Sequence, residues 1–161
     1  MLAAGAATRF GAPKQQLLLP QVLERLRQAP VDAVVVVAGA YPLEAEGARV
    51  VTCPEWERGP GASLRCGLAA LAPDTEAALI VLADGPALAP EAVERVLAAW
   101  RAGSGPLLAA SYGGDRSHPL LVARELWGSV PDEGLRALEP LLVPCDDLGA
   151  PGDVDTPEDL P

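Results

Sequence analysis

AALIVLADGPALAPEAVERVLAAWRAG, residues 77–103, has the pattern of one strand, one turn and one helix. Its first seven residues are all apolar, which is typical of a strand that is buried on both faces of a sheet. From Ala89 onward, apolar residues recur at three- and four-residue spacing. Pro90 lies in the first turn and Gly103 follows the last one, as in a well-delimited helix. Asp84 begins the turn between the two elements, directly where the strand stops.

The same alternation recurs along the chain. Near-continuous apolar runs predict three further strands, at residues 33–37, 48–53 and 106–112. Helical spacing predicts two further helices, at residues 21–29 and 62–72. Alternating strands and helices imply right-handed crossovers and a mostly parallel sheet with helices on both faces. The sequence therefore predicts an α/β fold of the Rossmann-like, doubly wound kind, formed by residues 1–161 as a single domain.

The composition limits the classes of partner. The chain carries a formal net charge of −10 and has a sequence pI of about 4.4. A protein this acidic repels nucleic acid and anionic membranes at long range, so neither is expected as a partner. A small anionic substrate stays compatible with this charge, because local amides, an arginine, a lysine and a divalent cation can outweigh the global field. The sequence contains no uncharged apolar run of membrane-spanning length and no recognisable leader, so we expect neither insertion nor secretion.

The three cysteines are Cys53, Cys66 and Cys145. They are odd in number, widely spaced and form no C-x-x-C pair. This pattern predicts reduced thiols in a cytoplasmic protein, and neither a disulfide framework nor a zinc site.

The loop that ends at Lys14 has the composition of a phosphate-binding loop. Small residues at positions 3–7 would let backbone amides approach an anion closely. Arg9 could bridge phosphate oxygens, and Lys14, the only lysine of the chain, could act as a point charge. The same composition also fits an ordinary glycine-containing turn with two solvated cations. The loop matches neither a Walker A motif nor a G-x-G-x-x-G fingerprint.

Three aspartates fall where a ligand would bind. Ligands of open α/β sheets lie beyond the carboxyl ends of the strands, and Asp84 follows such an end. Asp153 and Asp155 stand near the terminus in GDVDTPEDL and could join Asp84 to hold Mg²⁺, which prefers oxygen ligands. Two alternatives remain: Asp84 could only cap a turn, and Asp155 could only precede a helix that begins at Thr156.

His118, in DRSHPLL, is the only histidine. It could serve as a base, as a substrate contact or as a solvent-exposed loop residue. No serine of the chain lies in a G-x-S-x-G frame, so the chemistry of a hydrolase triad is not supported.

In their order, these motifs resemble those of the MobA-like nucleotidyltransferase family, and more narrowly its molybdenum cofactor cytidylyltransferase branch. LAAGAATRFGAPK (2–14) is similar to the family's L-A-A-G-x-S-x-R-M-G-x-P-K, and GPGASLRCGLAAL (59–71) to its nucleotide-holding G-x-x-x-S-L-R-x-G-L. LADGPAL (82–88) resembles a strand that ends in D-x-P, and SHPLL (117–121) resembles G-H-P-x-L. DEGLRAL (132–138) and DVDTPEDL (153–160) match the last two motifs.

The resemblance implies a fold of the nucleotide-diphospho-sugar transferase type and a Mg²⁺-dependent nucleotidyl transfer that releases pyrophosphate. The donor would be an NTP, specifically CTP, and the phosphorylated acceptor would be molybdopterin, with a molybdoenzyme maturation partner downstream. Guanylyl transfer and transfer to a sugar or polyol phosphate are the related alternatives. A non-catalytic nucleotide-binding or cofactor-escort protein is the alternative of another class.

The resemblance also assigns roles to residues. The expected catalytic residues are Arg9, Lys14 and Asp84. The expected nucleotide-binding residues are Leu2, Ala3, Ala4, Gly5, Arg9, Lys14, Ser63 and Leu64. The expected metal ligands are Asp84 and Asp155, with Asp153 as a further partner, and His118 is expected to contact the acceptor.

The chain departs from the family pattern at its first strand, which is almost absent, and at several shortened connections. These departures indicate either a compact chain or missing segments, and we expect the second, because a two-residue strand would anchor the loop poorly.

Overall fold

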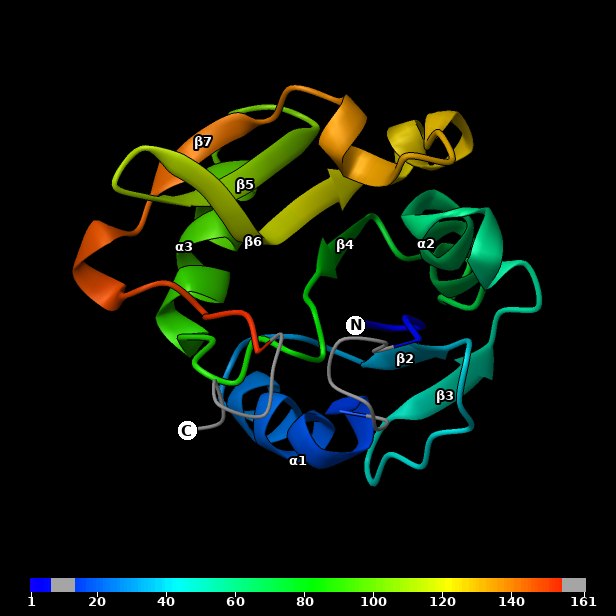
Figure 1. The fold of residues 1–161 in the computed structure, drawn as a ribbon. Coiled ribbons are helices and arrows are strands. Elements are labelled where there is room, and N and C mark those ends of the chain that lie inside the picture. Colours follow the sequence, from blue (N-terminus) through cyan, green and yellow to red (C-terminus); the bar gives the residue numbers. More distant parts are fainter. Residues whose placement is uncertain (7–13, 155–161) are drawn as a thin grey trace.

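The structure is a computed structural model that describes residues 1–6 and 14–154. The strands of this part of the chain are β1 (Leu2–Ala3), β2 (Val35–Ala38), β3 (Arg49–Thr52), β4 (Ala77–Ile80), β5 (Leu107–Tyr112), β6 (Asp115–Ala123) and β7 (Leu141–Pro144). The α-helices are α1 (Lys14–Arg27), α2 (Pro60–Ala69) and α3 (Pro90–Arg101), and the short 3-10 helices are η1 (Trp56–Arg58), η2 (Arg124–Ser129), η3 (Gly134–Ala137) and η4 (Asp146–Leu148). Figure 1 shows their arrangement.

The strands form two sheets that meet at β1. The first sheet is parallel, in the order β1-β2-β3, and the second is mixed, in the order β4-β6-β5-β7. Leu2 joins them: its N–H donates to the carbonyl of Val81, at 2.9 Å, and its carbonyl accepts from the N–H of Ala83, at 3.0 Å. The short β1 therefore lies between the two sheets and links them.

The predicted α/β fold is confirmed, but the apolar periodicity predicted neither β7 nor β6. β6 is the longer of the two. It runs antiparallel to both β4 and β5. Its first four residues, 115–118, are polar or charged, so this half of the strand lacks the apolar run by which the other strands are recognised.

The helices cover the faces of the sheets with the apolar stripes that their sequences predict. Leu19 and Val22 of α1 share one core cluster with Val36 of β2, whereas Leu64 and Leu68 of α2 belong to the other. Because successive strand residues point to opposite faces, α1 and α2 pack on opposite sides of the first sheet (Figure 1).

Helix α1 is longer than predicted, since it begins at Lys14 and continues through Pro20. Its buried face includes Leu18 and Leu23, so burial of apolar surface outweighs the cost of a proline within the helix.

Two glycines let α2 approach its neighbours closely. A Cβ on Gly61 would lie 1.7 Å from the carbonyl oxygen of Pro131, and one on Gly67 would lie 2.7 Å from Cγ2 of Val37. Neither position has room for a side chain. The glycines of GPGASLRCGL therefore have a packing role, whatever the motif does for a ligand.

The prediction that all three cysteines are reduced is wrong for two of them. Cys53, which follows β3, and Cys66, in α2, form a disulfide, with Cα atoms 5.8 Å apart and a sequence separation of 13. The pairing arises because α2 folds back along the end of β3, which spacing alone does not reveal. Cys145 is a free, buried thiol.

Within the described part of the chain, no helix combines the length and apolar character needed to cross a bilayer.

Candidate active site

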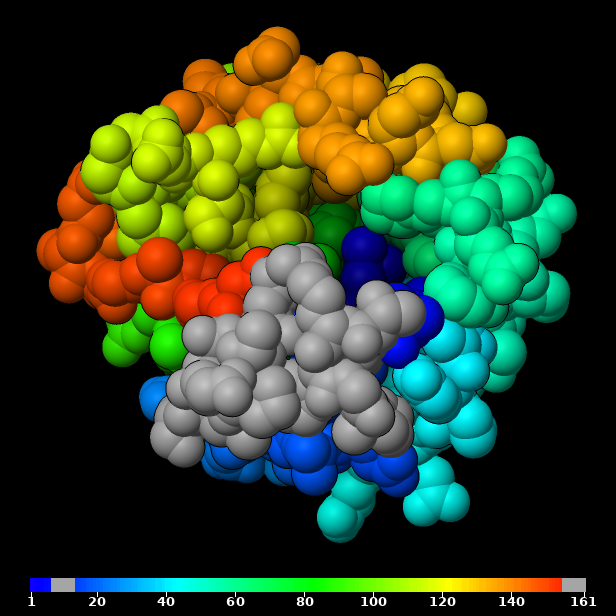
Figure 2. Space-filling view, in the orientation of Figure 1, coloured from blue at the N-terminus to red at the C-terminus, as the bar shows by residue number. Residues whose placement is uncertain are grey.

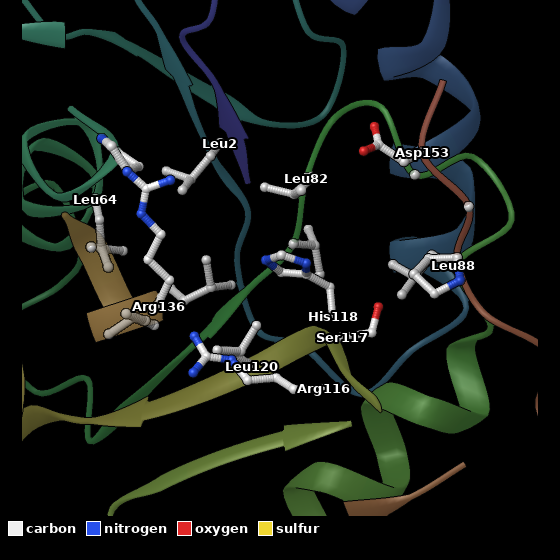
Figure 3. Close-up of a pocket in the computed structure, with 18 of the residues that line it drawn as sticks. Leu2, Leu64, Leu82, Leu88, Arg116, Ser117, His118, Leu120, Arg136 and Asp153 are labelled. Carbon is white, nitrogen blue, oxygen red and sulfur yellow. The ribbon is translucent and has the colours of Figure 1, made fainter. Parts of the chain in front are cut away.

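A cavity of about 480 Å³ opens at the carboxyl ends of β1 and β4, where the two sheets meet. Figure 2 shows this hollow between the N-terminal residues, α2 and the region of β6, and Figure 3 shows its lining. The lining residues are Leu2, Pro60, Leu64, residues 80–82, Gly85, Leu88, residues 116–118, Leu120, residues 133–136 and residues 151–153. The cavity thus lies where the rule for open α/β sheets predicts a ligand.

Lys14 and Asp84 meet beside this cavity. The Nζ atom of Lys14 lies 2.9 Å from Oδ2 of Asp84 and donates to the carbonyl of Val154, at 2.5 Å. Lys14 is only 6% exposed, so its charge is buried together with a compensating carboxylate. The N–H of Val154 donates to the backbone carbonyl of Asp84, at 3.1 Å. Three segments far apart in sequence are thereby joined at Lys14, Asp84 and Val154.

The residues expected to hold a metal are only partly covered by the structure. Asp153 lines the cavity on the Leu88 side (Figure 3), while Asp155 and the expected catalytic residue Arg9 lie outside the described residues. In the described ranges, no group of three or more His, Cys, Asp or Glu side chains could hold a metal ion. Mg²⁺, however, commonly takes only one or two carboxylates, with waters and substrate phosphates completing its shell. Asp84 and Asp153 fit that donor set.

The residues expected to bind the nucleotide fall into two groups. Leu2 and Leu64 line the cavity. Ala3, Ala4 and Ser63 are buried and do not line the cavity. They could contact a ligand only through backbone atoms or after small movements. Gly5 is exposed, and its carbonyl accepts a hydrogen bond from Nε2 of Gln15, at 3.0 Å. Gln15, a buried side chain that sequence reasoning did not select, therefore fixes the start of the loop.

His118 lines the middle of the cavity, with Arg116 and Arg136 on one side of it and Asp153 on the other (Figure 3). Burial lowers the pKa of His118 from 6.5 to about 4; the charge of Asp84 raises it and that of Arg116 lowers it by smaller amounts. The imidazole is therefore neutral near pH 7 and suited to hydrogen bonding with a ligand.

Two arginines of the cavity had no predicted role. Arg116, on β6, donates from Nη1 to the carbonyl of Leu138, at 2.7 Å. Arg136, on η3, is exposed, and none of the described residues forms a hydrogen bond or ion pair with its side chain. The sequence held a signal for Arg136, because it stands in DEGLRAL, one of the motifs that resemble the family pattern.

A network of ion pairs holds the segment before η3 against α2. Arg65 pairs with Asp132 and donates to the carbonyl of Val130, at 2.7 Å. Arg58 reaches the same carboxylate at 3.3 Å, and the N–H of Gly61 donates to the carbonyl of Asp132 at 2.9 Å. The hydrogen bond from Arg65 holds the pKa of Asp132 below its usual value. Arg65, in the ASLRCGL stretch, thus binds protein groups and shapes one wall of the cavity.

Comparison with solved structures finds the same fold in several proteins. The homologue of Mycobacterium tuberculosis Rv0371c from Mycobacterium sp. strain JC1 superimposes with a TM-score of 0.82 and 26% identity, over 99% of this chain and 90% of that one. A manganese complex of Rv0371c from M. tuberculosis H37Rv gives 0.76 and 25%, over 98% and 92%. Molybdopterin-guanine dinucleotide biosynthesis protein A from Archaeoglobus fulgidus gives 0.66 and 16%, over 98% and 92%, which shows the fold alone.

A search of curated protein sequences finds no significant match. The model of the MobA-like NTP transferase domain matches residues 1–140, which is most of the chain. The chain therefore belongs to the MobA-like NTP transferase family and is a nucleotidyltransferase.

Proposed function

We propose that this nucleotidyltransferase transfers the CMP group of CTP to the phosphate of molybdopterin in a Mg²⁺-dependent reaction that releases pyrophosphate. The observation that carries the proposal is the Lys14–Asp84 pair beside the cavity, which unites a cation for phosphate with a carboxylate for a metal. The choice of CTP and molybdopterin rests on the resemblance of GPGASLRCGLAAL and SHPLL to the cytidylyltransferase branch. The archaeal neighbour's name, a molybdopterin-guanine dinucleotide biosynthesis protein, supports a molybdopterin acceptor.

In this proposal an oxygen of the acceptor phosphate attacks the α-phosphorus of CTP. The bond between the α-phosphorus and the oxygen that bridges it to the β-phosphate breaks, and pyrophosphate leaves with the electron pair. Lys14, held in place by Asp84 and Val154, and Arg9 of the same loop neutralise charge on the phosphates. Such a reaction depends on positioning and on electrostatic stabilisation, so it needs no protein nucleophile.

Asp84 and Asp155, with Asp153 as a further partner, would hold the divalent cation. When bound, the cation would neutralise charge at the α-phosphate and orient it for attack. The manganese complex of Rv0371c supports a divalent cation in this fold. The exposed fraction of the Asp84 side chain, 22%, leaves its carboxylate accessible to an ion.

The nucleotide would lie against the end of β1 and the first turn of α2. We assign its binding to Leu2, Ala3, Ala4 and Gly5 with Arg9 and Lys14, and to Ser63 and Leu64. The acceptor would lie on the β6 side of the cavity, where neutral His118 offers a hydrogen bond.

The single domain, the cytoplasmic location and the molybdoenzyme maturation partner stay proposals that rest on the family resemblance. The disulfide between Cys53 and Cys66 removes the argument for the cytoplasm that was based on reduced thiols.

The direct test incubates the protein with Mg²⁺, molybdopterin and each of the four NTPs in turn, and measures pyrophosphate. We expect release with CTP and almost none with the Asp84→Asn variant. Release with GTP alone would select the guanylyl alternative, and release only with sugar or polyol phosphates would replace the acceptor. Nucleotide binding without pyrophosphate release under any condition would favour an escort protein.

A further inference from the structure

We propose that Arg116 and Arg136 form a second anion-binding subsite in this cavity, which holds a negatively charged group of the acceptor that does not react. The inference deepens the proposed function and rests on it. It gives the acceptor two anionic groups: the phosphate that receives the CMP group, and a second group at the other end of the molecule. Phosphate, carboxylate and thiolate groups all have the required charge.

The first support is the distribution of charge in the cavity. Asp153 lies on one side of His118, close in sequence to Val154 and hence to the Lys14–Asp84 pair. Arg116 and Arg136 lie on the other side (Figure 3). An acceptor whose phosphate reacts beside Asp84 therefore extends toward the two arginines.

The second support is the state of Arg136. Its guanidinium has five N–H donors, and no described residue accepts from them, although it lies in a cavity whose other walls are apolar at Leu64 and Leu135. A charge-assisted hydrogen bond from a guanidinium to an anion is stronger than a hydrogen bond between neutral groups. The N–H groups of Arg136 can therefore donate hydrogen bonds to an anion.

The third support is that both arginines are held on one connected frame. The hydrogen bond from Arg116 to Leu138 ties β6 to the end of the same segment that carries Arg136. The pairing of Arg65 with Asp132 ties the start of that segment to α2. The backbone that carries both arginines is therefore fixed before the ligand arrives, so the ordering cost of binding is limited mainly to the side chains.

Glu133 also lines the cavity and is exposed. Its carboxylate lowers the positive potential of this end without cancelling the two guanidinium charges. The Glu133→Gln change should therefore tighten the binding of an anion, in the direction opposite to the loss of either arginine.

The binding test uses inorganic phosphate as the probe. The protein is titrated calorimetrically with phosphate, both alone and after saturation with Mg²⁺ and α,β-methylene-CTP, a non-reacting analogue. We expect Arg116→Gln and Arg136→Gln each to weaken phosphate binding by about fivefold or more. Arg101→Gln, which removes the same charge at the end of α3 and outside this cavity, should change it by less than about twofold. Failure of the parent protein to bind phosphate, or equal weakening by Arg101→Gln, overturns the subsite.

Failure of the proposed function gives a different result. If the CTP analogue does not bind, the nucleotidyl transfer proposal fails, while the titration of the nucleotide-free protein still decides on the arginines.

The kinetic test separates acceptor from nucleotide. With CTP and molybdopterin, Arg136→Gln should raise KM for the acceptor by about tenfold and leave KM for CTP within about twofold. Arg136→Lys should restore part of the affinity, because it keeps the charge but not the planar fork. A rise in KM for CTP with no change for the acceptor would assign Arg136 to the nucleotide and refute the proposal. Arg136 forms no hydrogen bond or ion pair with the described residues and is exposed, so this variant should fold even if Arg116→Gln does not.

Discussion

The two ends of the cavity hold their cations in opposite ways. Lys14 is buried and is paired with Asp84 and with a backbone carbonyl, whereas Arg136 is exposed and is bonded to none of the described residues. A buried ammonium must be compensated by protein groups, because the cost of desolvating it alone would be several kcal/mol. An exposed guanidinium can instead be hydrated until a ligand arrives. The cation of the proposed reaction end is therefore held by protein groups, whereas the cation at the far end is left to solvent or to a ligand.

The strongest disturbance of the reaction end is Asp84→Asn. It removes the charge that holds Lys14 and a proposed ligand of the cation, so kcat should fall by about a hundredfold or more. The measurement is pyrophosphate release over a range of Mg²⁺ concentrations, with a thermal melt to check that the fold is kept. Asp153→Asn is the matched control and should cost less. If Asp153→Asn proves the more damaging of the two, the ranking of Asp84 as the main ligand and Asp153 as a further partner is wrong, although a metal site survives.

Lys14→Ala tests the cation of the same end. If Lys14 stabilises charge that develops in the transition state, kcat should fall by about ten- to a hundredfold, more than the affinity for the nucleotide falls. Single-turnover kinetics together with a direct binding titration separate the two quantities. An unchanged rate would remove Lys14 from the mechanism and leave it the role of neutralising Asp84.

His118, between the two ends, is tested by pH. Its folded-state pKa is about 4, below the ordinary value of 6.5, so the unfolded chain takes up a proton first as the pH falls. The stability that comes from keeping this imidazole neutral is fully present above about pH 6.5 and is lost as the pH falls toward 4, with a total of at most about 3 kcal/mol. Urea unfolding measures the free energy of unfolding of the protein and of His118→Gln at each pH. The first value minus the second should decrease as the pH falls through this window. If the difference between the two free energies of unfolding does not change with pH, burial does not depress the pKa of His118.

The smallest expected effect comes from the support of the far end. Arg65→Gln breaks the ion pair with Asp132, but Arg58 and the backbone hydrogen bond from Gly61 still hold the segment. We therefore expect KM for the acceptor to rise by only about threefold, with KM for CTP unchanged. Steady-state kinetics beside Arg101→Gln measures this change. A larger effect on CTP than on the acceptor would mean that Arg65 acts mainly through α2 and the nucleotide.

The predictable part of the fold is the part whose residues face a core on a regular period. Residues 77–80 and 90–101 form a strand and a helix within the predicted stretch, because continuous and three-to-four spacing of apolar side chains determine them. β6 was missed because Arg116 and His118 of its first half line the cavity, so these positions carry polar side chains where a buried strand would carry apolar ones. A strand whose side chains line a cavity lacks the apolar run by which a buried strand is recognised.

The two ends of the candidate site also differ in how far the sequence predicted their residues. Asp84 and Asp153 were predicted because strand ends converge in this kind of sheet. Arg116 was not predicted, because it lies on the unpredicted β6. Arg136 was given no role although it stands in the DEGLRAL motif, because its 3-10 turn has no periodic signal that would place the side chain. The disulfide was missed because two cysteines 13 residues apart are brought together only when α2 packs against the end of β3.

That disulfide also limits how the protein can open locally. It closes a segment that contains η1 and the first turn of α2, including Ser63. Hydrogen bonds within the segment can break without letting its two ends move apart, so fluctuations there stay local. Arg58 lies inside the segment and is half exposed, at 53% of its side chain. A protease that cuts after Arg58 would leave both fragments covalently joined through Cys53 and Cys66, and they would separate only after reduction.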